Sequence, residues 1–448
     1  MASDITCGNY EPTPSNFGAS SSALTLDSPP TRIASANAPN ASQRDSGAFF
    51  RDARICPDGS RVLTAADDRS LSLYPLPSQT LTSPQLAPHW IHSPSDSLLS
   101  FDWYPGASSA DPSMFAFAMG VKDHPVHLLD GNDRRIRASY PIIDHTERFI
   151  APNSMLFALD GTSLYCGFEN AIEIFDVSRP GEEGFRMKTT ASRTSRTGQK
   201  GLISTLDFSP SQGTSLLAAG SFAGSIGLYN SSSPSPLVGI LPSTQKGGIT
   251  KVLFHPTMDH LLFAASRQSN YIEVFDLRNF ALEPIKLERK GRTNQRLGFD
   301  IDPTGEWLIA GDQASFRLPL LVGNTSRDNA HTSHASTRTD LSLYSTPLSF
   351  LTPILQLPSN QHILTRFLRV FIEPIGATFF HPDFPNTNQI VTCSGTRKFP
   401  LQRKGRRGKD GEDDESSEDE SDSDGEGETL AGEVEEDGKD SLQVFTLG

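Results

Sequence analysis

The chain has 448 residues and is 36% apolar, with 32 prolines and 35 glycines, which suits either two or three ordinary domains or one large domain of short strands and many turns. The formal net charge is −14, but residues 410–440 hold 17 acidic residues and one lysine, so the remainder of the chain is close to neutral. Four cysteines without a C-x-x-C spacing favour neither a disulfide framework nor a zinc site, and with no secretory signal and no run of about 18 apolar residues we expect a soluble intracellular protein.

Residues 1–45 are rich in Ser, Pro, Ala and Asn and contain few large apolar side chains. Such a segment cannot bury enough surface to offset the conformational entropy lost on ordering. We therefore predict a disordered tail over 1–45 and a folded domain over 46–448, with order beginning near Phe49.

From Phe49 onwards one pattern recurs: an apolar strand, a polar turn, a second strand, another polar turn and a third strand. Seven copies align on the residue at the first turn, which is Pro57, Pro105, Leu159, Pro210, Pro256, Pro303 or Pro382. These positions are 48, 54, 51, 46, 47 and 79 residues apart. A period of about 40–50 residues of short strands is typical of a β-propeller with four strands per blade. The repeats predict an all-β, seven-bladed WD40-type propeller, the alternative being an unrelated all-β domain.

The third strand of several copies ends in Asp or Asn, as in WD repeats, with Leu, Phe or Tyr in place of the Trp. These residues are Asp130, Asp176, Asn230 and Asp276. Alternation such as "IEVF" at 272–275 fits half-buried strands.

Two long segments interrupt the repeats. After "IAGDQ" no convincing third strand follows, and 316–372 is predicted to be either a lineage-specific insertion or a gene-model error, which we favour because the strand is missing rather than interrupted. A second insertion, basic then acidic, is predicted to be disordered over 403–440. After it, "SLQVF" at 441–445 is expected to be the third strand of the last blade and to close the ring.

No catalytic constellation is found in the sequence. His255 and His381 precede turn prolines at equivalent positions and are expected to be structural. The glycines of 220–227 lie between two strands and open no helix, so a phosphate cradle is not expected. Asp58 and Asp302 are expected to cap turns. The sequence predicts no enzyme, no cofactor and no metal site.

Three basic segments, 185–200, 286–296 and 396–409, are more informative. The first two connect consecutive blades, and the third follows the second strand of the last blade, so the topology places all three on one rim. There they would bind RNA phosphates with salt-dependent affinity. The alternatives are solvated loops or a nuclear import signal at 403–409. The candidate RNA-binding residues are Arg186, Lys188, Arg193, Arg196, Lys200, Arg289, Lys290, Arg292, Arg296, Arg397, Lys398, Arg403, Lys404, Arg406, Arg407 and Lys409.

The acidic run that follows contains serines in a context that acidophilic kinases favour: Ser416, Ser417, Ser421 and Ser423. We expect a solvated, disordered loop. Because it directly follows "RKGRRGK", we also hypothesise that it competes with RNA for the basic rim.

Several stretches are more specific than the repeats themselves. "TNQRLGFDIDPTGEWLIAG", "GGITKVLFHP", "SLYCGFENAIEIFDVSRPG" and "PVHLLDG" resemble the WD-repeat telomerase Cajal-body protein family. The resemblance covers roughly 49–316 and 375–397, and it is most specific at 293–305 and 174–181. The disrupted sixth blade, the short tail and the acidic insertion depart from the family.

The resemblance implies a nuclear propeller that binds small non-coding RNAs carrying a short box motif and escorts them to a nuclear body. In animals these include telomerase RNA, and fungal relatives are linked to pre-mRNA splicing. The style of the tail and loops indicates a fungal relative, so assembly of small RNA–protein particles carries over better than telomerase trafficking. The expected partners are small nuclear or Cajal-body-type RNA and its proteins. The expected location is the nucleus, with or without a cytoplasmic pool. The alternative is a protein-only adaptor, similar to a G-protein β subunit, without RNA binding.

Overall fold

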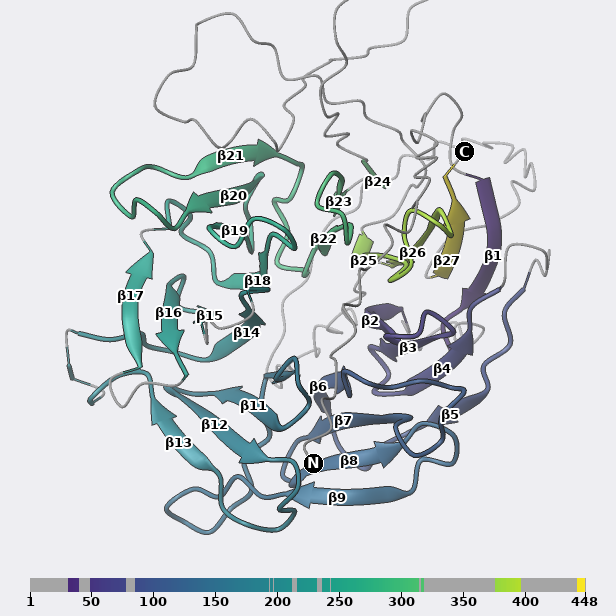
Figure 1. Ribbon diagram of the computed structural model, residues 1–448, viewed down its shortest axis with the longest axis horizontal. Helices are drawn as coiled ribbons and strands as arrows, with labels where there is room; N and C mark the ends of the chain where they lie inside the picture. Colours follow the sequence, from purple (N-terminus) through teal and green to yellow (C-terminus); the bar gives the residue numbers. More distant parts are fainter. Residues whose placement is uncertain are drawn as a thin grey trace, which may run out of the picture.

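The computed structural model describes residues 31–39, 49–77, 85–192, 194–195, 197–211, 216–231, 236–241, 243–313, 316–317, 375–395 and 441–447. All regular elements in these ranges are β-strands, and none of these residues forms a helix that could span a membrane. The strands form antiparallel sheets arranged around a central axis (Figure 1): six sheets have four strands, and one has three. The predicted all-β propeller is therefore confirmed, with six four-stranded blades among the described residues, and the predicted number of seven blades stays a prediction.

Five blades follow the chain in order. The first comprises β2 (Phe50–Ile55), β3 (Arg61–Ala66), β4 (Leu71–Pro75) and β5 (Trp90–His92). The second comprises β6 (Leu98–Trp103), β7 (Ala116–Val121), β8 (Val126–Asp130) and β9 (Ile136–Tyr140). The third comprises β10 (Ser154–Phe157), β11 (Ser163–Phe168), β12 (Ala171–Asp176) and β13 (Phe185–Lys188). Then come β14 (Ile203–Phe208), β15 (Leu216–Ser221), β16 (Ile226–Asn230) and β17 (Leu237–Leu241), followed by β18 (Ile249–Phe254), β19 (Leu261–Ser266), β20 (Tyr271–Asp276) and β21 (Ile285–Glu288).

The hydrophobic core lies between neighbouring sheets rather than in a single centre. Phe263 and Val274, from β19 and β20, pack against Phe299 and Leu308 of the next sheet, and all four side chains are buried. Each sheet thus covers one face of its neighbour. Burial of apolar surface contributes about 25 cal/mol per Å², so these interfaces stabilise the ring as a whole.

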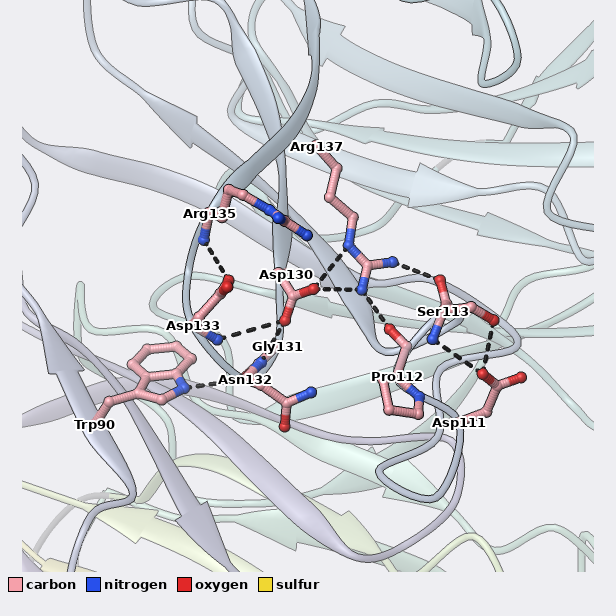
Figure 2. A network of polar contacts seen from close by, with 10 residues as sticks. All are labelled: Trp90, Asp111, Pro112, Ser113, Asp130, Gly131, Asn132, Asp133, Arg135 and Arg137. Carbon is pink, nitrogen blue, oxygen red and sulfur yellow. Dashed lines mark hydrogen bonds and ion pairs between the residues drawn. The ribbon is translucent and has the colours of Figure 1, made fainter.

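The aspartates that end the third strands have a structural role. Asp130 Oδ1 accepts the backbone N–H of Asn132, and Asp176 and Asp276 accept the N–H two residues on in the same way. Figure 2 shows that Asp130 also forms an ion pair with Arg137, whose guanidinium donates to the carbonyl of Ser113. The aspartate therefore caps the turn and fastens it to the adjacent loop.

The predicted structural histidines join neighbouring sheets. His255 Nε2 lies 3.0 Å from the carbonyl oxygen of Gly305, and His381 Nε2 lies 3.0 Å from that of Gly59. Both rings are buried. Their structural assignment is confirmed, because each bridges to the first turn of the next repeat.

The last blade joins the two ends of the described chain. It consists of β25 (Ile375–Phe380), β26 (Gln389–Ser394), β27 (Ser441–Thr446) and β1 (Thr31–Asn37) in the order β1-β27-β26-β25. Figure 1 shows the purple β1 beside the yellow β27. The prediction that "SLQVF" forms the third strand and closes the ring is confirmed.

The predicted disordered tail over 1–45 is wrong for the part that forms β1. Ala34 pairs with Val444 and Ala36 with Leu442, and both alanines are buried in the core of this blade. The sequence did not indicate a strand because alanine carries little apolar surface. The stabilising partner, β27, also lies at the far end of the chain and supplies the hydrogen bonds that local sequence cannot reveal.

The three-stranded sheet occupies the place of the sixth repeat. It contains β22 (Phe299–Ile301), β23 (Leu308–Gly311) and β24 (Phe316–Arg317). The expectation that no third strand follows "IAGDQ" is corrected by β24, a two-residue strand in which Phe316 pairs with Gly311. The remainder of 316–372 lies outside the described residues, so its origin stays a prediction.

Candidate nucleic-acid interface

The turns between second and third strands share one edge of the propeller with the connections between blades, and we call this edge the interblade rim. Gln199, in the connection after β13, donates from Nε2 to the carbonyls of Ala219 and Ser225 at the next blade's turn. Gln295, in the connection after β21, donates to the carbonyl of Gly395, where the third basic segment begins. The described parts of the first two basic segments therefore lie on one rim, whereas the third segment, 396–409, lies outside the described residues and its position stays a prediction.

Positive charge gathers on one arc of this rim. Among the described residues of the arc, the exposed lysines and arginines include Lys188, Lys200, Lys246, Lys290 and Arg292. The same arc carries the exposed acids Glu169 and Glu288. Over the first two blades the acids outnumber the cations on the rim, with Asp67, Asp68, Asp96 and Asp123 against Arg69 and Lys122. An arc of this kind attracts a polyanion from one side only.

Two of the residues predicted to contact RNA instead bond to other groups of the protein. Arg289 is only 5% exposed, and its Nη1 donates to the carbonyl of Leu297, so it cannot reach a phosphate. Burial lowers its pKa to about 10, opposed by the attraction of Asp312. Arg186 forms an ion pair with Glu173, at 2.6 Å between Nε and Oε2, although its side chain keeps partial exposure.

The remaining candidates divide by location. Arg296 is half-buried at the inner end of the arc. Arg193 and Arg196 lie outside the described residues, as do all candidates of the third segment: Arg397, Lys398, Arg403, Lys404, Arg406, Arg407 and Lys409. The phosphorylation candidates Ser416, Ser417, Ser421 and Ser423 also lie outside them.

Sequence reasoning missed three residues near Arg296. Phe222 lies in the β15–β16 turn and Arg267 in the β19–β20 turn, and each guanidinium carbon lies close to the Phe222 ring: 4.5 Å from its centroid for Arg267 and 5.5 Å for Arg296. Arg51, at the start of β2, lines the same end of the central channel as Arg296. Only Arg296 belongs to a basic run. For the other three residues the sequence offered one local signal: Phe222 occupies a turn in which the other repeats carry small or polar residues.

The first strands of the blades line a central cavity of about 310 Å³. Asp207 Oδ2 accepts the N–H of Phe254 at 2.6 Å, and Asp300 Oδ2 accepts that of Phe380 at 3.0 Å, so each carboxylate ties its strand to the next sheet. Lys251 donates from Nζ to the carbonyl of Phe299 at 2.7 Å. Burial raises the pKa of Asp207 to about 7, although the Phe254 N–H and Lys251 oppose the shift.

Asp207→Asn should change how stability depends on pH. The folded-state pKa lies above the ordinary value near 3.8, so this group stabilises the fold fully at low pH, and that contribution is lost as the pH rises through about 7. An asparagine retains the acceptor for Phe254 and removes the charge. The variant should therefore gain on the order of 2–4 kcal/mol relative to wild type between pH 5 and pH 9, measured by urea unfolding.

The matched control is Asp160→Asn, a turn cap whose pKa hydrogen bonds from Thr162 lower, so that its titration lies below this pH range. The stability difference of this control from wild type should not change between pH 5 and pH 9. Parallel pH profiles for Asp207→Asn and wild type would contradict the raised pKa.

Comparison with known proteins identifies relatives, although no protein-family model matches the chain. Telomerase Cajal body protein 1 of Bos taurus is 35% identical over 269 residues, which cover 59% of this chain and 48% of that protein. The Homo sapiens protein of the same name is 33% identical over 269 residues, again 59% and 48%. Guanine nucleotide-binding protein negative regulator 1 of Schizosaccharomyces pombe is 28% identical over 282 residues, 60% of this chain and 70% of that protein.

The chain thus spans about half the length of the telomerase Cajal body proteins that it matches. The resemblance to the WD-repeat telomerase Cajal-body proteins, predicted from the sequence, is confirmed over the matched part, and a fungal relative is among the matches.

Proposed function

We propose that this chain, a WD-repeat propeller homologous to telomerase Cajal body protein 1, is a nuclear, non-enzymatic scaffold that binds small non-coding RNA. It would assist the assembly or localisation of small RNA–protein particles, including those of pre-mRNA splicing or telomerase. The three-stranded sheet would be the sixth blade of seven, within a propeller domain extending to residue 448. RNA would lie on the interblade rim, while other faces contact particle proteins.

The observation that carries this proposal is the positive arc of the interblade rim. Its exposed cations come from the end of β13 and from separate connections after β13, β17 and β21, yet the fold aligns them along one edge. A phosphodiester backbone presents evenly spaced negative charges, and each neutralised phosphate releases counterions. The opposite rim carries acidic residues that cap turns, such as Asp176 and Asp276, and these would repel phosphates.

Replacement of Lys290 and Arg292 by alanine should weaken RNA binding and flatten its salt dependence. For single-stranded RNA, each lost phosphate contact reduces the slope of log affinity against log salt by about 0.7. The measurement is fluorescence anisotropy with short single-stranded RNA over a salt series. The matched control is Arg135→Ala with Arg179→Ala, two arginines on turns of the opposite rim, which should leave the slope unchanged.

The natural ligand is tested by crosslinking in cells followed by RNA sequencing. Enriched small nuclear or Cajal-body RNAs would support the proposal, and background RNA alone would refute it. The latter outcome would favour a protein-only adaptor, the role in keeping with the name of the Schizosaccharomyces pombe relative.

A further inference from the structure

The ring of Phe222 lies beside two guanidinium groups at the inner end of the positive arc. The guanidinium carbons of Arg267 and Arg296 lie 4.5 and 5.5 Å from the centroid of its ring. A cation within about 6 Å of an aromatic centroid is attracted by the ring's electron density. The three side chains come from three separate loops and are all half-buried, so they form a fixed but reachable surface.

The backbone holds this cluster in place. Gly247 and Gly248 lie in the connection between β17 and β18, where a Cβ on Gly247 would lie 2.0 Å from the carbonyl oxygen of Arg267. A Cβ on Gly248 would lie 2.6 Å from that of Phe222. The Arg267 N–H also donates to the Gly248 carbonyl at 2.9 Å. Only a pair of glycines lets the two turns approach this closely, so the platform exists before any ligand arrives.

The cluster concentrates positive charge in a partly desolvated place. Burial lowers the pKa of Arg296 to about 10, and although Asp52 opposes this, the neighbouring charges of Arg51, Arg267 and Arg54 lower it further. No carboxylate of the described residues lies within ion-pair distance of Arg296. An anion placed here would therefore relieve the repulsion that Arg296 experiences from the neighbouring guanidinium groups.

The cluster borders the central channel through Arg296. Arg51 and Arg296 line the cavity of about 310 Å³ at this end, and Arg54 and Lys251 line it further in. A phosphate at the mouth would meet the first pair, while a planar group attached to it could lie against the arginine and phenylalanine planes. The carboxylates of an acidic peptide could pair with the arginines, but they have no aromatic plane that would stack on the phenylalanine ring.

From this geometry we propose that Phe222, Arg267 and Arg296 form a stacking platform for an unpaired RNA nucleobase whose phosphates contact the surrounding arginines. The platform rests on the proposed RNA-binding function and specifies its ligand as single-stranded rather than duplex RNA. Unpaired bases expose the planar faces that aromatic rings and guanidinium groups stack on, whereas a duplex conceals them.

The test uses the full chain and three probes of equal phosphate number: a short single-stranded RNA of mixed sequence, the same backbone with abasic residues, and a duplex. Phe222→Leu keeps an apolar side chain but removes the ring. It should weaken binding of the single strand roughly 5- to 100-fold, as loss of one base stack predicts, and leave the abasic strand unaffected. Phe222→Trp should restore binding of the single strand, which a role of this side chain in packing alone would not explain.

Two further variants complete the experiment. Arg296→Gln should weaken binding of both single strands and reduce the salt slope, because it removes a charge as well as a plane. The control is Phe280→Leu, an exposed phenylalanine on a turn of the opposite rim, which should change nothing. Thermal melting of every variant verifies the fold.

The outcomes separate the two proposals. Equal affinity of wild type and Phe222→Leu for the single strand would overturn the platform and leave RNA binding by the rim intact. Equal affinity of wild type for the abasic and normal strands would do the same. If wild type bound none of the three probes, both the platform and the proposed function would be overturned.

Discussion

A chain that begins at residue 41 should melt on the order of 10 °C below the full chain. This truncation removes β1, which pairs with β27 from Thr31 to Asn37 and buries Ala34 and Ala36. Each backbone hydrogen bond contributes a net 0.5–1.5 kcal/mol, so losing the ladder costs several kcal/mol. One kcal/mol lowers the melting temperature of a domain of 150–250 residues by about 2–4 °C.

The size of this effect depends on ring closure. Without β1, strand β27 becomes an open edge and the last blade loses its outer strand, so that only contacts between neighbouring sheets, such as that of His381 with Gly59, still join this blade to the first. An unprotected edge strand also promotes aggregation. The truncated chain should therefore both melt earlier and aggregate at lower concentration, measured by differential scanning calorimetry and light scattering.

The matched control is a chain that begins at residue 31, which removes a stretch of nearly the same composition but keeps β1. It should melt within a degree or two of the full chain. If both truncations melted alike, β1 would contribute nothing to closure, in keeping with the predicted disordered tail over 1–45.

Deletion of residues 410–440 should tighten RNA binding on the order of tenfold at low salt. The deleted segment carries 17 acidic residues and one lysine. The described strands that flank it in the chain both reach the interblade rim, because β26 ends at Ser394 and the paired β27 begins at Ser441. A tethered acidic arm therefore acts at high effective concentration beside the cations that would bind RNA.

The gain should shrink as salt rises, because screening shortens the range of the arm's charges from about 30 Å at 0.01 M to about 8 Å at physiological ionic strength. A short Gly-Ser linker from Lys409 to Ser441 keeps β27 attached in this variant. Phosphorylation of Ser416, Ser417, Ser421 and Ser423 would add about 1.5–2 negative charges at each site and should oppose RNA binding further.

A same-length variant with the acidic residues changed to Gln or Asn separates charge from bulk, and it should bind as tightly as the deletion. The companion change of Arg403, Lys404, Arg406, Arg407 and Lys409 to alanine should weaken binding and flatten the salt slope. An RNA dissociation constant that is the same with and without residues 410–440, at both low and moderate salt, would reduce the run to a solubilising loop.

The ring of repeats could be predicted because each blade is local in sequence. The strands from β18 to β21 follow one another between residues 249 and 288 and are joined by short polar turns, so their alternation and turn residues carry nearly all the information that the blade needs. The third strand after the acidic insertion was also predictable, because "SLQVF" is the only apolar stretch left to complete the last blade.

The candidate site could be predicted only in outline. Topology places a connection between blades on a known rim, so the rim that carries the first two basic segments followed from the order of the strands, whereas Lys246 was not among the predicted residues. Whether a given arginine faces solvent does not follow, since neighbours in a basic run meet different surroundings. Arg289 turns inward to the carbonyl of Leu297, while Lys290 beside it is exposed.

The sequence by itself determined the propeller, its repeat boundaries and the rim that carries the positive charge, because these depend on short-range periodicity and on a repeating order of strands. Only the tertiary structure decided that 31–37 completes the last blade and that Phe222, Arg267 and Arg296 meet. Those contacts join loops and strands far apart in the chain. Their stability comes from partners that a local pattern does not contain: a distant backbone edge for β1, and for Phe222 the close approach of two turns over a pair of glycines.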